Sequence, residues 1–436
     1  MISKKYFTWQ QLASILIASM IGTGVFTSLG FQVLDIHNSK AIVFLWLLGG
    51  ALSLLGAISY ARLATHFPSS GGEYNYLSRL FHPSFGFTSG YISILVGFAA
   101  PIAAACYAFG GYFVHFNPIL TSKLGISFTA NQAALSVLIL LTGLNFFHKI
   151  LGAKFQVVFT AIKIVTMLLL IVAGLIYPSN NIAFENETPF FEEILSPSFA
   201  IAIFWVSYSY SGWNALCYIS GEIENPKKTI MKSLVSGTLF VTIVYILINW
   251  VFLKHIPVSE MAGKPDLVEK YAQFAFGSEI ATFANGVICI LLISTINSML
   301  IIGPRVSTQI GKDYNALKFL SQRNKNDVPQ ISLLIQFGLS CIYLITSSFE
   351  SLIVYIGFVL SLFTFSSILG LIIYEWRKKM LSIKTIFAPA VFLLFNFWIL
   401  VYGAIEKPIE MLVGISACFS GFVLYHFIKK THAESD

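Results

Sequence analysis

The sequence predicts an all-α membrane protein with about twelve transmembrane helices. Of its 436 residues, 56% are hydrophobic and only 11% are charged, whereas a soluble domain carries about 25% charged residues. Apolar runs of about 20 residues, the length that crosses a hydrocarbon core as a helix, recur along the whole chain. The strands of a membrane barrel would instead alternate over about ten residues, and the runs do not alternate in this way.

Each apolar run is expected to form a helix, because backbone N–H and C=O groups in lipid need partners within their own segment. No linker or low-complexity stretch divides the chain, so residues 1–436 are predicted to form a single membrane domain. One longer loop, residues 260–277, mixes charged and apolar residues and predicts a short interfacial helix. The predicted spans are 9–34, 41–65, 85–114, 129–147, 153–177, 197–220, 232–253, 279–303, 330–347, 350–375, 383–402 and 408–428.

The distribution of Lys and Arg predicts the orientation in the membrane. With an even number of spans both termini share one side, and that side holds most of the 27 Lys and Arg residues. The positive-inside rule then places both termini in the cytoplasm of a multi-pass protein of the cell (inner) membrane. The net charge of +7 follows from this bias. Contact with anionic membrane lipid explains the charge, and we expect no nucleic acid partner.

Residue types that carry covalent chemistry are sparse. The histidines lie at the ends of predicted spans or in loops, and the chain has no nucleotide-binding motif. We therefore expect neither an enzyme nor a primary pump, and no metal or other cofactor. No cysteine lies in a predicted outer loop, so we expect no structural disulfide and no ancillary subunit disulfide-linked through residues 115–128. The cysteines are Cys106, Cys217, Cys289, Cys341 and Cys418.

Two predicted spans are interrupted at their centres by residues that form helices poorly. The first span contains Gly22-Thr23-Gly24, and each glycine costs about 1 kcal/mol relative to alanine in a helix interior. Paired interruptions in two halves of a chain indicate a transporter site, because the freed backbone groups must face protein, water or substrate. The alternative is that the glycines serve close helix packing. The sixth span carries Ser207, Ser209, Ser211, Gly212 and Asn214 at its middle.

Four segments carry a family resemblance. They are the Gly-Thr-Gly break, "GALSLLGAISYARLATHFPSSGGEYNYL" (Gly50 to Leu77), "YSGWNALCYISGEIENPKKTI" (Tyr210 to Ile230) and "NSMLIIGPRVSTQIGKD" (Asn297 to Asp313). In this order they resemble the amino acid–polyamine–organocation superfamily, and within it the L-type amino acid transporter-like permeases. The resemblance covers nearly the whole chain.

The resemblance implies a LeuT-type fold, in which two five-helix repeats have inverted topology and the first and sixth helices are broken at the midplane. Here the repeats would be residues 8–177 and 197–375, followed by two further helices in residues 383–428. The small-molecule partner would be an amino acid.

Site residues follow from the resemblance position by position. At the first break, backbone N–H groups and a hydroxyl would bind the substrate carboxylate at the positive end of a helix dipole. At the sixth-helix break, carbonyl groups would bind the substrate ammonium, which has three donors and no acceptor. The matching residues are Ile21, Gly22, Thr23 and Gly24 in the first helix and Tyr208, Ser209 and Ser211 in the sixth.

The side-chain pocket and the gate are also implied by the family. The aromatic gate, commonly Phe, is Tyr208 here, and Ser211 replaces a common glycine. Arg62 stands where the family often has Glu, and an arginine at a helix end can snorkel to the interface. No carboxylate or basic residue matches the pocket positions, which favours a neutral substrate. The expected pocket residues are Gly212 and Asn214, with Pro101, Cys106 and Phe358 as further candidates.

Lys163 is the candidate coupling residue. It lies mid-span in "FTAIKIVTMLLL", where a lysine costs about 2.5–3.5 kcal/mol on insertion scales. In sodium-independent family members a lysine in the fifth helix takes the place of a sodium ion and reaches the first-helix break. The alternative is a lysine that satisfies helix carbonyls structurally.

The sequence therefore predicts a sodium-independent transporter of neutral L-amino acids that works by alternating access. The residues leave exchange and proton coupling as equal possibilities. Two other functions stay open, namely a sodium-coupled symporter of the same fold and a membrane sensor that binds amino acids without moving them.

Overall fold

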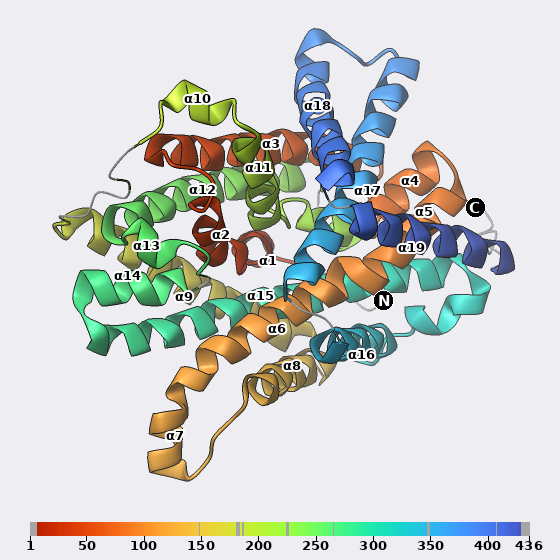
Figure 1. The fold of residues 1–436 in the computed structure, drawn as a ribbon. Coiled ribbons are helices and arrows are strands. Elements are labelled where there is room, and N and C mark those ends of the chain that lie inside the picture. Colours follow the sequence, from red (N-terminus) through yellow and green to blue (C-terminus); the bar gives the residue numbers. More distant parts are fainter. Residues whose placement is uncertain are drawn as a thin grey trace.

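A computed structural model describes residues 7–147, 149–179, 184, 187–223, 226–264, 266–346, 349–406 and 408–428. Within these residues every regular element is a helix (Figure 1). Eight helical segments of this part are long and apolar enough to cross a membrane. The predicted all-α fold class is confirmed, whereas the count of twelve spans and the inverted repeat stay predictions.

Each predicted span coincides with helix in the structure. The third span is composite, because α5 (Pro83–Ile92) continues through the π-helical segment η1 (Ser93–Phe98) into α6 (Ala99–Phe113). Nine other spans match α3 (Ser39–His66), α8 (Ala130–Phe147), α9 (Lys149–Ile176), α12 (Pro226–His255), α15 (Ser278–Asp313), α16 (Gln330–Thr346), α17 (Phe349–Arg377), α18 (Ile383–Glu406) and α19 (Pro408–Phe427).

The first and sixth spans are the two that break. In the first, α1 (Trp9–Met20) ends four residues before α2 (Gly24–Gln32) begins. In the sixth, α11 (Pro197–Ser209) gives way to a turn and then to the 3-10 helix η3 (Ala215–Glu222). Both interruptions fall on the glycine- and serine-rich stretches, where intrinsic helix propensity is lowest.

The broken first span lies at the centre of the bundle. Its α1 half packs against α9, α12 and α15, and its α2 half packs against α11 (Figure 1). Of its most apolar window 89% is buried inside the protein, against 28% for the corresponding window of α9. A segment buried on every side places its freed backbone groups among protein groups and not in lipid.

Short helices occupy the connections. The predicted interfacial helix of residues 260–277 corresponds to α14 (Leu267–Phe276), whose apolar face packs on α15. After α3 the chain turns back through Gly71 and Gly72, both with positive φ, into α4 (Glu73–Leu80). The other short elements are η2 (Val114–Phe116), α7 (Asn117–Leu124), α10 (Phe190–Ile194), α13 (Val258–Met261) and η4 (Asn315–Ser321).

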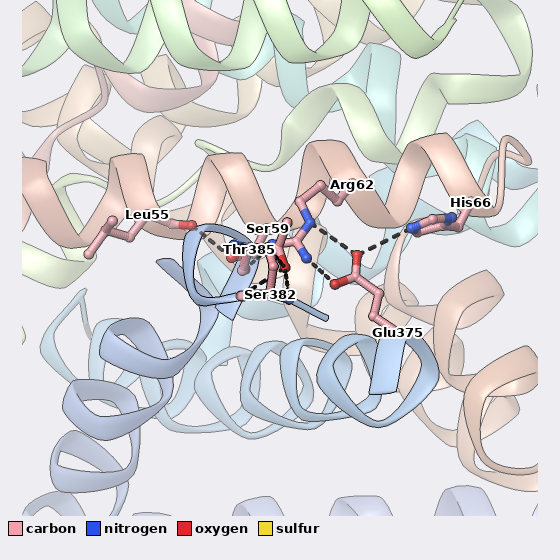
Figure 2. A network of polar contacts seen from close by, with 7 residues as sticks. All are labelled: Leu55, Ser59, Arg62, His66, Glu375, Ser382 and Thr385. Carbon is pink, nitrogen blue, oxygen red and sulfur yellow. Dashed lines mark hydrogen bonds and ion pairs between the residues drawn. The ribbon is translucent and has the colours of Figure 1, made fainter. Parts of the chain in front are cut away.

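An ion pair ties α3 to α17. The Arg62 guanidinium donates from Nε to Glu375 Oε1 at 3.1 Å and makes further contacts to Glu375 Oε2 and to the Thr385 carbonyl in α18. His66, one turn further along α3, lies 3.3 Å from the same carboxylate (Figure 2). Arg62 is therefore held by partners inside the protein.

Candidate substrate site

The break in the first span exposes backbone N–H groups at the start of α2. The Gly22 N–H donates to the Met20 carbonyl at 2.9 Å, which closes a tight turn. Across the described residues, the N–H groups of Thr23, Gly24 and Val25 have no hydrogen-bond partner. Unpaired N–H groups at a helix N-terminus attract an anion such as a carboxylate.

The carbonyl side of this break is held by a buried lysine. The Lys163 ammonium donates to the Ile21 carbonyl at 2.7 Å and contacts Thr295 Oγ1 at 2.8 Å. Thr295 Oγ1 also donates to the Ile21 carbonyl, at 2.8 Å. Lys163 itself is 0% exposed. The expected contact between Lys163 and the carbonyls of the break is thus present at Ile21.

A tyrosine of α12 joins the two broken helices. The Tyr245 hydroxyl lies 2.6 Å from the Met20 carbonyl and 3.0 Å from the Ser209 carbonyl. One side chain therefore contacts a freed carbonyl from each break. The sequence offers no sign of this role, because Tyr245 is one of several aromatic residues in an apolar run.

Two glycines allow the breaks to approach each other closely. A Cβ built on Gly24 would lie 2.6 Å from Ser209 Oγ and 2.7 Å from Ser209 Cα. Gly212 has a φ of +93°, and a Cβ there would lie 2.6 Å from the Ser19 carbonyl. A Cβ on Gly22 would meet only Thr295, at an ordinary 3.8 Å. Gly24 and Gly212 therefore allow close helix packing, which is the alternative to a purely binding role. Gly22 does not, because a Cβ there would fit.

Two cavities adjoin the sixth-span break. The larger, of about 120 Å³, lies between α3, α11, α17 and α18, and the smaller, of about 70 Å³, lies on the side of α6 and α15. Every described residue that lines either cavity is uncharged. Of the expected site residues, the larger cavity is lined by Tyr208, Ser211, Gly212 and Asn214, and the smaller by Pro101, Ser211, Gly212 and Asn214.

Apart from Phe358, the remaining expected residues line neither cavity. The Ser209 hydroxyl bonds to the Trp205 carbonyl at 2.7 Å and to the Ser28 hydroxyl at 2.8 Å. Cys106 is buried and lines neither cavity. The side chain of Phe358 lies outside the described residues. The first-helix residues that line neither cavity are Ile21, Gly22, Thr23 and Gly24.

Tyr208 contacts both parts of the site. Tyr208 lines the larger cavity, and its hydroxyl lies 3.3 Å from Thr23 Oγ1. The Tyr208 carbonyl accepts a hydrogen bond from the Ser211 N–H at 2.9 Å. A movement of this side chain would therefore change the connection between the cavity and the first-helix break.

A buried carboxylate, which the sequence interpretation did not place here, lies next to the site. Glu73 Oε1 accepts a hydrogen bond from Asn214 Nδ2 at 2.9 Å and from the Tyr60 hydroxyl at 2.7 Å. The turn through Gly71 and Gly72 brings Glu73 back from the end of α3 to this position. The family resemblance of Gly50 to Leu77 implies a re-entrant loop here, but it did not indicate that Glu73 would lie beside Asn214.

The described residues offer little for metal or disulfide chemistry. Among them, no group of three or more His, Cys, Asp and Glu side chains is placed to hold a metal ion. The five cysteines are free thiols, and only Cys341 is partly exposed. The site therefore consists of neutral hydroxyl, amide and backbone groups with one lysine and one glutamate behind them.

The chain resembles known transporters along nearly its full length. A family described as amino acid permease matches residues 7–431. The chain is 26% identical to Asc-type amino acid transporter 1 of Mus musculus, with 97% of this chain and 81% of the relative covered. It is 27% identical to b(0,+)-type amino acid transporter 1 of Mus musculus, with 94% and 85% covered. It is 26% identical to the serine/threonine exchanger SteT of Bacillus subtilis, with 96% of each chain covered.

Proposed function

Since this chain belongs to the amino acid permease family, we propose that it moves neutral L-amino acids across the cell membrane by alternating access, without sodium. The family and the relatives are transporters and not enzymes, and the chain is a multi-pass membrane protein of the amino acid–polyamine–organocation superfamily. The proposal includes a LeuT-type arrangement of residues 8–177 and 197–375 and cytoplasmic termini.

The contact between Lys163 and Ile21 carries the proposal of sodium independence. A cation in this position stabilises the partial negative charge of the freed carbonyl in the first-helix break. A bound sodium ion would otherwise provide this stabilisation. Unlike a sodium ion, the ammonium is part of the Lys163 side chain. It is fully buried and lies 2.7 Å from the Ile21 carbonyl oxygen. A lysine in this environment costs about 2.5–3.5 kcal/mol on insertion scales, so we infer that it is kept for function.

The uncharged lining of both cavities supports a neutral substrate. The unpaired N–H groups at the start of α2 suit a carboxylate, and the carbonyls of the sixth-span break suit an ammonium group. A zwitterion then needs no charged side chain for either end. Because Tyr208 contacts both Thr23 and the larger cavity, we assign it the role of the gate that opens between them.

Proteoliposomes test this function directly. A panel of labelled amino acids is offered with and without unlabelled amino acid inside, with and without an inward proton gradient, and in sodium or choline buffer. We expect uptake of neutral amino acids that is unchanged in choline. Stimulation by internal amino acid indicates exchange, and stimulation by the proton gradient indicates symport. Uptake that requires sodium would favour the symporter, and binding without flux would favour a sensor.

Tyr208 variants test the gate. Tyr208→Phe loses only the 3.3 Å contact with Thr23, which is worth about 0.5–1.5 kcal/mol, and we expect it to retain a large part of the flux. Tyr208→Ala also removes the ring that lines the cavity, so uptake should fall much further. The measurement is the initial rate of labelled uptake at matched protein density. Equal and near-normal rates for both variants would show that Tyr208 is an ordinary packing residue.

A disulfide-linked subunit is not part of the proposal. One relative, 25% identical over 97% of this chain, is named large neutral amino acids transporter small subunit 2 of Homo sapiens. The segment that we expect to attach such a partner, residues 115–128, contains no cysteine. The absence of a tethered partner stays a prediction, and a non-reducing gel of the membrane-extracted protein tests it.

A further inference from the structure

Glu73 is a buried carboxyl group that directly supports the cavity wall. It is 3% exposed, and it lies at the start of α4, which is not among the helices long enough to cross a membrane. Oε1 accepts hydrogen bonds from Tyr60 and Asn214, whereas Oε2 has no hydrogen-bond partner among the described residues. The Tyr218 side chain lies beside the same carboxyl group.

Charge compensation is missing around this group. In the described part of the chain, no Lys, Arg or His side chain forms an ion pair with Glu73. The titratable groups that face it are Tyr60 of α3, Tyr76 of α4, and Cys217 and Tyr218 of η3, all of which are neutral near pH 7. From α17, the neutral hydroxyls of Thr364 and Ser367 adjoin Tyr60.

Burial favours the neutral form of this carboxyl group. It raises the pKa of Glu73 above its ordinary value, and the hydrogen bonds from Tyr60 and Asn214 together with the neighbouring Tyr218 hydroxyl only partly oppose the shift. A proton from solvent would add to Oε2, which accepts no hydrogen bond among the described residues. Oε1 would keep both of its hydrogen bonds. No other reactant is consumed.

Two side chains connect the cavities with the surroundings of Glu73. Asn214 lines both cavities, and Tyr218 lines the smaller one. We propose that Glu73 is a proton-binding site of the transport cycle and takes up a proton when an amino acid fills the cavity beside Asn214. A substrate displaces water from the cavity, and removing water from the surroundings of a carboxylate favours its neutral form.

The sign of the pH dependence follows from this linkage. The pKa of the Glu73 carboxyl is higher in the substrate-bound protein than in the free protein. Affinity for the amino acid therefore rises as pH falls through the bound-state pKa and levels off below the free-state pKa. One linked proton changes the affinity by at most about tenfold per pH unit. This inference rests on the proposed function, because it requires an amino acid to bind in the cavity.

Equilibrium binding of tritiated L-alanine, L-serine, L-threonine and L-leucine to the purified protein, measured from pH 5 to pH 8.5, tests the proposal. We expect the wild-type affinity to rise toward low pH. Glu73→Gln copies the protonated form in shape and charge, so its affinity should be flat with pH. Glu193→Gln is the matched control, because Glu193 is also buried and its side-chain hydrogen bonds within the described residues come from His37 and Thr188, away from the cavities. It should keep the wild-type profile.

A second measurement separates titration from a structural role. In weak buffer with a pH-indicator dye, L-amino acid binding should withdraw protons from solution in the wild type but not in Glu73→Gln. A flat wild-type profile, proton release, or a pH dependence that survives in Glu73→Gln would overturn the proposal while leaving amino acid binding intact. A wild-type protein that binds none of the amino acids would overturn the proposed function and this inference together.

Discussion

Gly24→Val is expected to abolish amino acid binding. The Cβ alone would lie 2.6–2.7 Å from the Oγ and Cα atoms of Ser209, a separation that real Cβ atoms essentially never show. Backbone of α2 or α11 must therefore shift, which separates the two breaks and moves the unpaired N–H groups of residues 23–25. Overpacking of this kind costs about 1–3 kcal/mol for small side chains, so Gly24→Ala should already weaken binding about tenfold.

Controls for the Gly24 variants come from the same chain. Gly143→Ala in α8 adds a methyl group with no neighbour within 4 Å, so it measures the effect of an alanine without a clash. Ser209→Ala removes the hydroxyl oxygen but leaves the backbone of residue 209 in place, so it should relieve Gly24→Ala only in part. Ligand binding is compared in protein that elutes as a single species in detergent. A folded Gly24→Val protein with native affinity would show that this approach of the breaks is not needed for binding.

Lys163→Ala should reduce transport by about 10- to 100-fold. A hydrogen bond to a charged group contributes about 1.5–3 kcal/mol, and each 1.4 kcal/mol is a factor of ten. The variant loses the contacts with Ile21 and Thr295 and leaves a void beside the first-helix break. Of the two side chains that donate to the Ile21 carbonyl, only Thr295 then remains, so we expect the break to sample conformations that cannot bind substrate.

Lys154→Ala supplies the matched control, because Lys154 lies on the same helix α9 but is exposed. Its flux should remain near that of the wild type.

The pH dependence of exchange separates two roles of Lys163. If Lys163 is a fixed support, any pH dependence comes from Glu73, and the rate of exchange should otherwise not change with pH. If Lys163 carries the proton, gradient-driven uptake disappears in Lys163→Ala and persists in Glu73→Gln. Wild-type uptake that stops when choline replaces sodium would contradict the place assigned to Lys163.

The broken helices could be predicted because their signal is local. Two glycines around Thr23 and the serines near Gly212 lower helix propensity within a few residues, and the structure breaks at these places. The contact of Lys163 with the first break was also within reach, since a lysine inside an apolar run needs a partner. The family resemblance then supplied which break it should meet.

Contacts between distant segments could not be predicted from the same signals. Tyr245 and Glu73 reach the site from α12 and α4, and a single tyrosine or glutamate in the sequence does not reveal which way it points. Gly24 illustrates a different limit. The sequence indicates that this position requires a residue without a side chain. Only the structure identifies Ser209 as the neighbour that occupies the space. Propensity locates where a helix stops, whereas tertiary packing decides what the ends touch.

The pairing of Arg62 with Glu375 has a consequence for biosynthesis. The two residues are 313 positions apart, so at about 5–20 residues per second the ribosome needs roughly 15–60 s to deliver the carboxylate after the arginine. Throughout that interval α3 carries a cation whose final partner does not exist. The helix can be inserted, but its packing is completed only when α17 arrives. Nascent chains that end before residue 375 therefore carry an arginine in α3 without the carboxylate that pairs with it in the complete protein.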